Sequence, residues 1–158
     1  MPISVVVITV SDRSAAGSRV DSSGPVAVAA LRAAGFACDD ARVVADGVAS
    51  VEGALRDALG TGAGVVITTG GTGVSPRDET PEATRRVIER ELPGIAEELR
   101  RRGSADTPAS LLSRGVAGTV GDAVIINLPG SPAAVTVGVE LIVTLAGHLL
   151  DQLAGRDH

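Results

Sequence analysis

Three continuous apolar runs constrain the fold of this 158-residue chain more than any other feature. They occupy residues 3–10, 65–69 and 123–128, and β-branched side chains dominate them. A strand that is apolar at every position is covered on both faces, which is typical of a parallel sheet between helices. Segments with helical signals alternate with these runs, so the sequence predicts a three-layer α/β fold with a mostly parallel sheet.

The segments between the runs carry helix and strand signals. We expect helices at residues 25–34, 50–59 and 80–92, a short one that ends near residue 102, and a C-terminal one that Ser131 caps. Thr80 and Pro81 mark a helix start, with Thr80 as the cap. A weaker strand is expected within residues 36–45. The chain has no repeat, linker or low-complexity tract, so we expect one domain over residues 1–158.

Composition excludes several classes of function. The 14 basic and 19 acidic residues give a net charge of −5, which argues against nucleic acid as a partner. Phe36 is the one aromatic side chain among Phe, Tyr and Trp, so bases cannot be bound by aromatic stacking. The single cysteine, Cys38, permits no internal disulfide and fits a cytoplasmic protein. Asp39 and Asp40 beside it disfavour a thiolate, so we do not expect a cysteine nucleophile.

Neither apolar terminus predicts a membrane segment. The N-terminal run lacks a preceding basic region and a cleavage-like segment, so it predicts a strand rather than a signal peptide. Glu140 and His148 interrupt the long apolar stretch at residues 133–150, which favours a buried helix over a membrane span. We expect His148 to be a packed or interface residue, and residues 100–102 to be a solvated, basic helix end.

Four loops rich in Gly, Ser, Asp or Pro follow predicted strands, at residues 11–24, 46–47, 70–80 and 129–132. Ligands of open parallel sheets bind beyond the carboxyl ends of the strands, so these loops predict a site. Gly70, Gly71 and Gly73 permit a sharp turn whose amides can hold an oxyanion. No lysine follows, and Pro76 replaces the last glycine of a dinucleotide motif. A tight turn without a ligand is therefore an equally good interpretation of these glycines alone.

Two aspartates follow predicted strands, Asp46 and Asp78. A carboxylate near phosphates is unfavourable unless a hard cation lies between them, so this pair could hold Mg²⁺ against a triphosphate. Aspartates in turns often bond only to turn amides, and the residues alone favour that simpler interpretation. The PGSP turn at residues 129–132 offers helix N-terminal amides to a phosphate or pterin oxygen, although capping by Ser131 alone would account for it.

Four segments together resemble one family over nearly the whole chain. They are VSDRSAAGSRVDSSGP (residues 10–25), TTGGTGVSPRDETPEATRRVIERELPGIAEELR (68–100), LLSRGVAG (111–118) and IINLPGSPAAV (125–135). They resemble the molybdopterin adenylyltransferases, the MogA/MoaB-like family of molybdenum cofactor biosynthesis. The resemblance implies a three-layer α/β domain, usually a homotrimer, that uses Mg²⁺. The implied reaction joins the terminal phosphate of molybdopterin to the α-phosphate of ATP, and the adenylated product passes to a molybdenum-insertion enzyme.

The resemblance also implies site residues. The catalytic aspartates of the family correspond to Asp78, in its R-D-x-T-P motif, and to Asp46, and both are candidate metal ligands. Ser113 of the LSR motif is implicated in the molybdopterin site. The remaining candidate residues for binding substrate or nucleotide are Ser11, Gly70, Gly71, Thr72, Gly73, Pro129, Gly130, Ser131 and Pro132.

Three hypotheses follow. The first is the adenylyltransferase, which Arg77 favours because members of the MoaB branch often lack an arginine before the aspartate. The second is a molybdopterin-binding or carrier protein without adenylation activity. The third is an oligomeric scaffold, which rests on the apolar C-terminal helix.

Overall fold

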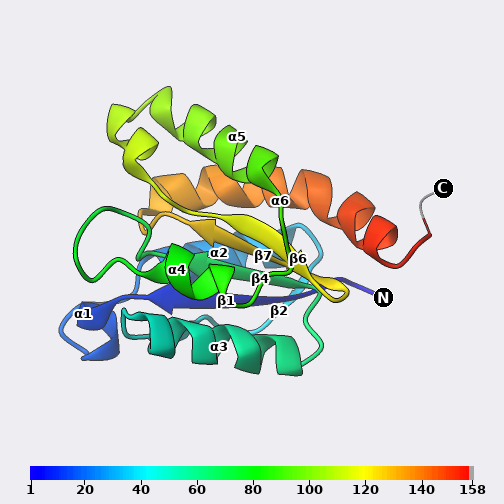
Figure 1. Cartoon of the computed structure of the whole chain (residues 1–158), viewed down its shortest axis with the longest axis horizontal. Helices are drawn as coiled ribbons and strands as arrows, with labels where there is room; N and C mark the ends of the chain where they lie inside the picture. The colour runs from blue at the N-terminus through cyan, green and yellow to red at the C-terminus, as the bar shows by residue number, and fades with distance from the viewer. Residues whose placement is uncertain (157–158) are drawn as a thin grey trace.

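The computed structural model describes residues 1–156, which form a seven-stranded sheet with helices on both faces (Figure 1). The strand order is β2-β1-β4-β7-β6-β5, and β3 pairs with β1 beyond the end of β2. The strands are β1 (Ser4–Val10), β2 (Ala37–Cys38), β3 (Arg42–Val44), β4 (Val65–Thr69), β5 (Arg90–Glu91), β6 (Ala117–Val120) and β7 (Ala123–Leu128). The three predicted apolar runs are therefore β1, β4 and β7, which lie side by side in the centre of the sheet.

Helices cover each face of the sheet and bury an apolar cluster against it. The helices are α1 (Asp12–Ala15), α2 (Ser23–Ala33), α3 (Val48–Gly60), α4 (Thr80–Arg85), α5 (Pro93–Ser104), the 3-10 helix η1 (Pro108–Leu112) and α6 (Pro132–Leu153). In Figure 1, α5 and α6 lie on one side of the sheet and α3 on the other. Successive residues of β4 serve the two clusters alternately: Val65 and Ile67 pack on the α2 and α6 side, and Val66 on the α3 side. The predicted three-layer architecture is confirmed.

The parallel register of the central strands aligns their carboxyl ends. Thr9 of β1 is paired with Thr69 of β4, and Thr69 in turn is paired with Leu128 of β7. The loops that follow these three strands therefore begin at the same edge of the sheet. This edge holds most of the predicted site residues.

The predicted helix over residues 80–92 is wrong in its second half. Helix α4 ends at Arg85, and β5 follows at the edge of the sheet. The backbone N–H groups of Glu89 and Leu92 donate to the carbonyls of Thr119 and Ala117, each at 2.8 Å. Pairing with β6 thus overrides the helical propensity of this charged segment. The antiparallel strand β6, which has only four residues, contains Gly118 and ends directly before Gly121, was not predicted.

Three further boundaries differ from the prediction. The weak strand within residues 36–45 is two short strands, β2 and β3. The first polar loop contains the single-turn helix α1. Thr80 lies inside α4 rather than at its cap, because its hydroxyl donates to the carbonyl of Gly70, at 3.1 Å. That bond ties the start of α4 to the end of β4.

Helix α6 has the length and the composition of a membrane span, with a mean hydropathy of 1.8, but core helices meet the same criterion. Its buried face, which includes Val135, Val139 and Ile142, packs on the sheet. A Cβ atom added at Gly138 would lie 2.5 Å from Cδ2 of Leu128, so a glycine lets the helix approach β7 closely. We interpret α6 as a helix that packs on the core.

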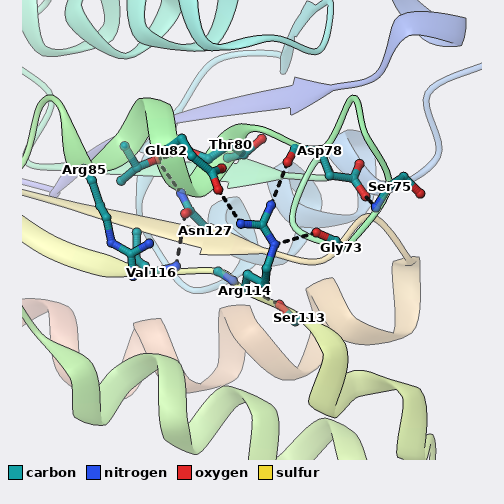
Figure 2. A network of polar contacts seen from close by, with 12 residues as sticks. Gly73, Ser75, Asp78, Thr80, Glu82, Arg85, Ser113, Arg114, Val116 and Asn127 are labelled. Carbon is teal, nitrogen blue, oxygen red and sulfur yellow. Dashed lines mark hydrogen bonds and ion pairs between the residues drawn. The ribbon is translucent and has the colours of Figure 1, made fainter.

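A buried amide joins the sheet to α4. Asn127 of β7 is 3% exposed, and its Nδ2 donates to the hydroxyls of Thr68 and Thr84, at 3.0 and 2.9 Å. Its Oδ1 accepts the N–H of Val116, at 3.1 Å (Figure 2). Buried polar groups that keep all their partners rigidify a core, whereas loss of one partner leaves the others unsatisfied.

Replacement of this amide tests its contribution. We expect Asn127→Ala to lower the free energy of unfolding by about 2–4 kcal/mol, because three buried polar groups lose their partner. Urea unfolding followed by circular dichroism measures the change. Gln152→Ala, which removes an exposed amide at the end of α6, is the control and should change stability by less than about 0.5 kcal/mol. Equal effects of the two substitutions would contradict the assigned role.

Candidate functional site

The carboxyl ends of β1 and β3 hold two aspartates in a reciprocal contact. The N–H of Asp12 donates to Oδ2 of Asp46, at 2.9 Å, and the N–H of Asp46 donates to Oδ1 of Asp12, at 3.1 Å. Arg77 adds a fork, since its Nε and Nη2 each donate to one oxygen of Asp12, at 3.0 Å. Nη2 also donates to the carbonyl of Asp46, at 3.0 Å. Two loops and the segment before α4 are thereby joined at one point.

Local structure explains how Asp12 reaches this position. The N–H of Ser11 donates to the carbonyl of Val44, at 2.9 Å, which joins the ends of β1 and β3. The hydroxyl of Ser11 caps α1 by accepting the N–H of Ser14, at 3.2 Å. This cap turns the chain sharply after β1 and directs Asp12 toward Asp46. Sequence reasoning missed Asp12, although it lies within the quoted VSDRSAAG segment.

The two aspartates differ in their electrostatic environment. Burial raises the pKa of Asp46, and the negative charges of Asp12 and Asp78 raise it further. The hydrogen bond from the Asp12 N–H and the charge of Arg77 oppose this shift. For Asp12, the hydrogen bonds from Arg77 lower the pKa. Ionised Asp46 is therefore disfavoured at this edge, and a cation would relieve that cost, because the Arg77 fork pairs with the carboxylate of Asp12 and not with that of Asp46.

The glycine turn lies against Asp46. Gly70 and Gly71 have positive φ angles of 91° and 67°. A Cβ atom at Gly70 would lie 2.4 Å from the carbonyl oxygen of Val10, and one at Gly71 would lie 2.2 Å from Oγ1 of Thr80 and 3.2 Å from Oδ1 of Asp46. Only glycine fits this close approach of two strand ends. The N–H of Gly70, expected to be exposed, instead donates to the carbonyl of Leu128, at 3.0 Å.

Asp78 closes the far end of this turn. Its Oδ2 accepts the N–H of Ser75, at 3.1 Å, and its own N–H donates to the carbonyl of Ser75, at 3.0 Å. A Cβ atom at Gly73 would lie 2.8 Å from the same Oδ2, so this glycine also makes room for a carboxylate. Asp78 therefore bonds to a turn amide, as the simpler interpretation predicts, and it is also close enough to Asp46 to raise the pKa of that residue.

The donor set of this edge fits Mg²⁺ that arrives with a polyphosphate. Asp46 and Asp78 are half-buried and offer carboxylate oxygens, the ligands that Mg²⁺ prefers. Within residues 1–156, no group of three or more His, Cys, Asp or Glu side chains is arranged to hold a metal ion. Mg²⁺ usually binds through one or two carboxylates, with phosphate oxygens and water as the other ligands. The pair suits that mode rather than a site built of protein ligands alone.

A polar cavity of about 120 Å³ adjoins the glycine turn. It lies where Gly130 approaches Gly70, since a Cβ atom at Gly130 would lie 3.3 Å from the Gly70 Cα. Asp21 lines the cavity and accepts the hydroxyl of Thr9, at 2.8 Å, and the N–H of Gly24, at 3.1 Å. The lining residues are Thr9, Val10, Ser11, Ser14, Arg19, Val20, Asp21, Ser22, Ser23, Thr69, Gly70 and Gly130. Apart from Ser11, Gly70 and Gly130, sequence reasoning did not single them out.

A second cavity contains Ser113 and Pro129, between α5, η1 and the start of α6. Ser113 lies at its wall, and its hydroxyl accepts the N–H of Gly115, at 3.3 Å. The prediction that Arg100 belongs to a solvated helix end is wrong. Arg100 is half-buried and donates to the carbonyls of Ser113 and Gly115, at 3.2 and 3.0 Å. Charged donors that satisfy two carbonyls fix the backbone, so Arg100 holds the Ser113 loop in place.

The other residues singled out in the sequence lie at helix ends, in the glycine turn, on β2 or on the surface of α6. Ser131 caps α6 by accepting the N–H of Ala134, at 3.2 Å, and Pro132 begins that helix, as predicted. Thr72 is buried in the glycine turn. Cys38 lies on β2, where burial raises the pKa of its thiol, in keeping with the expectation that it is no nucleophile. His148 lies on the exposed side of α6, with its Nε2 at 3.1 Å from Nε2 of Gln152.

Comparisons with known proteins show the family of the chain. The sequence family described as "Probable molybdopterin binding domain" matches residues 6–148. The molybdenum cofactor biosynthesis bifunctional protein of Synechococcus elongatus is 40% identical over 152 residues, which cover 96% of this chain and 48% of that protein. The chain thus spans about half the length of that relative. The molybdopterin adenylyltransferase of Pyrococcus furiosus is 38% identical over 149 residues, 91% of this chain and 87% of that protein.

Solved structures show the same fold. The molybdopterin biosynthesis Mog protein of Mycobacterium ulcerans superimposes with a TM-score of 0.90 at 42% identity, and the match covers 98% of this chain and 99% of that one. Sequence family, relatives and fold therefore agree, and the chain belongs to the molybdopterin-binding domain family of molybdenum cofactor biosynthesis.

Proposed function

We propose that the protein transfers the adenylyl group of ATP to the terminal phosphate of molybdopterin, which yields adenylated molybdopterin and pyrophosphate. The observation that carries this proposal is the placement of Asp46 and Asp78 beside one glycine turn, at the edge where the parallel strands end. Relatives that are named molybdopterin adenylyltransferases support it, and they do not favour a carrier without activity.

The chemistry requires positioning and charge neutralisation rather than a protein nucleophile. An oxygen of the molybdopterin phosphate attacks the α-phosphorus of ATP, and the bond from that phosphorus to the oxygen bridging to the β-phosphate breaks. Pyrophosphate leaves with the electron pair. Both substrates are anions, so they must be held in line while their mutual repulsion is screened.

The acidic pair accounts for a glycine loop without a lysine. Asp46 and Asp78 would hold Mg²⁺, which would supply neutralisation of the ATP phosphates when bound. Asp12 bonds to both the N–H and the carboxylate of Asp46, and Arg77 donates to the Asp46 carbonyl, so these two residues keep Asp46 in place. In this proposal, the acidic side chains form the edge that meets the nucleotide, and their mutual repulsion is relieved on binding.

The remaining candidate residues would line the binding sites of the two substrates. Gly70, Gly71, Thr72 and Gly73 form the turn that faces Asp46 and Asp78. Pro129, Gly130, Ser131 and Pro132 lead into α6, whose N-terminal amides suit a phosphate. Ser113 would bind on the molybdopterin side and Ser11 in the polar cavity beside Gly70.

Further parts of the proposal concern the setting of the reaction. We infer one domain over residues 1–158, because a single sheet joins every strand of residues 1–156. A homotrimer and delivery of the product to a molybdenum-insertion enzyme follow from the family resemblance. The lone cysteine favours work in the cytoplasm.

Loss of either carboxylate tests the activity. With molybdopterin, ATP and Mg²⁺, we expect the wild type to release pyrophosphate, and Asp46→Asn and Asp78→Asn to lower kcat at least about 100-fold, since each removes charge stabilisation at the phosphates. Asp57→Asn, on the exposed side of α3, is the matched control and should retain full activity. Omission of Mg²⁺ should abolish the release.

Other results would contradict the proposal in distinct ways. Tight binding of molybdopterin without pyrophosphate release in the wild type would establish the carrier function instead. Full activity of both variants would show that the acidic pair is not the reacting site. Sedimentation of the protein as a monomer at micromolar concentration would contradict the trimer but not the chemistry.

The raised pKa of Asp46 predicts an effect on stability. At pH 7 the folded protein holds Asp46 ionised although burial and two neighbouring aspartates disfavour that state. Asp46→Asn should therefore melt about 1–3 °C above the wild type at pH 7. As the pH falls through the raised pKa of Asp46, the folded wild type takes up a proton before the unfolded chain does, so the difference should shrink, and it should vanish below the ordinary pKa of 3.8, where both states are protonated.

Differential scanning fluorimetry at several pH values measures this difference. Asp57→Asn serves again as the control, because that exposed carboxylate should give no difference from the wild type at any of these pH values. A lower melting temperature for Asp46→Asn than for the wild type at pH 7 would show that the carboxylate stabilises the fold, contrary to its assigned role.

A further inference from the structure

We propose that Arg114 is a positioning residue that sets the place of the Asp78 carboxylate and links it to the Ser113 side of the site. The inference rests on the proposed function and extends it to a residue that the family resemblance does not assign. Figure 2 shows Arg114 at the centre of a polar network that reaches Gly73, Asp78 and Glu82.

The contacts of Arg114 hold both ends of one turn. Its Nε donates to the carbonyl of Gly73, at 2.8 Å, and its Nη2 donates to the carbonyl of Asp78, at 2.7 Å. Its backbone N–H donates to the carbonyl of Thr72, at 2.7 Å. Nη1 forms an ion pair with Glu82 of α4. One guanidinium thus fixes where the turn between Gly73 and Asp78 begins and ends.

Apart from Arg114, side-chain contacts from outside residues 73–78 reach this turn only through Arg77, among the bonds described for residues 1–156. Residues 74–77 are exposed, and the side chain of Val74 is 69% exposed. Within the turn, Ser75 and Asp78 bond to each other, which shapes the turn but does not anchor it to the sheet. Arg77 anchors its middle to Asp12. Ser75 orients the Asp78 carboxylate within the turn, and the two carbonyl contacts of Arg114 set where the ends of that turn lie relative to β6 and β7.

Arg114 also follows Ser113 directly in the chain. The Ser113 carbonyl accepts a hydrogen bond from Arg100, so the backbone before Arg114 is held from the opposite side, by α5. The proposed molybdopterin residue and the clamp on Asp78 therefore share one peptide unit. A rigid link of this kind keeps the reacting phosphate and the acidic pair at a constant separation.

The geometry requires arginine rather than lysine. A planar fork donates to two carbonyls and a carboxylate at once, whereas an ammonium group cannot span the same three acceptors. Arg114→Lys keeps the positive charge near Glu82 and removes the fork. The matched control is Arg56→Lys on α3, because Arg56 also pairs with a glutamate, Glu52, and donates to a carbonyl, that of Arg86 just after the end of α4.

Steady-state kinetics give the first measurement. We expect Arg114→Lys to lower kcat about 10- to 100-fold with less than about a threefold change in the KM for ATP, because a misplaced ligand of the metal mainly affects the transition state. Arg56→Lys should match the wild type in both. Arg114→Gln serves as a second variant if the lysine protein does not fold, which thermal melting establishes.

A double-mutant cycle separates positioning from a general loss of structure. If Arg114 acts through Asp78, then Arg114→Lys added to Asp78→Asn should lower the residual kcat by less than about twofold, since the group it positions is already gone. Additive losses would show that Arg114 acts independently of Asp78 and would overturn the inference. Wild-type kcat in Arg114→Lys would overturn it as well.

Hydrogen exchange of the substrate-free protein tests the clamp without any turnover. Arg114→Lys should raise exchange in a peptide that covers residues 72–79 and leave peptides of β1 and β4 as in the wild type, whereas Arg56→Lys should leave residues 72–79 unchanged. An unchanged rate in residues 72–79 would overturn the inference. Absence of activity in the wild type would overturn the proposed function instead, and the exchange result on Arg114 would still stand.

Discussion

The parallel pairing of β1, β4 and β7 is the constraint on which the rest of the structure depends. Their residues are buried on both faces, so a shift of one position along the register would move apolar side chains from one cluster to the other. The register also decides which loops lie side by side, because Thr9, Thr69 and Leu128 are aligned across the carboxyl ends of the three strands. The site at this edge is therefore a consequence of how the core packs, because the pairing of the strands already places its loops next to one another.

The chain tolerates unfavourable charge at this edge. Asp12, Asp46 and Asp78 lie close enough that two of them raise the pKa of the third, and Arg77 compensates only part of that cost. Hydrogen bonds between backbone and carboxylate hold the cluster in place despite the repulsion. A fold optimised for stability alone would place fewer acids here, and the proposed Mg²⁺ would relieve the repulsion between them.

The central strands and the position of Asp46 and Asp78 near their carboxyl ends could be predicted, although the residues alone favoured simple turn contacts for both aspartates, and the edge of the sheet could not. Long β-branched runs predict only strands, whereas residues 86–92 have helical propensity, and Arg90–Glu91 within them become an edge strand because β6 offers free backbone groups. Asp46 and Asp78 stood out as carboxylates after strands. Asp12, Arg100 and Arg114 were missed because their roles depend on backbone carbonyls and amides from distant segments, which no local pattern reveals.

One main-chain hydrogen bond joins the glycine turn to the segment that leads into α6. The N–H of Gly70 donates to the carbonyl of Leu128, directly before the turn at Pro129. The spacing between the glycine turn and the start of α6 is thus set by main-chain atoms, and a substitution that keeps the backbone conformation of both turns leaves it unchanged. Gly70, whose φ is 91°, is the position at which this separation is most easily lost, so a change there should displace the start of α6 as well as the glycine turn.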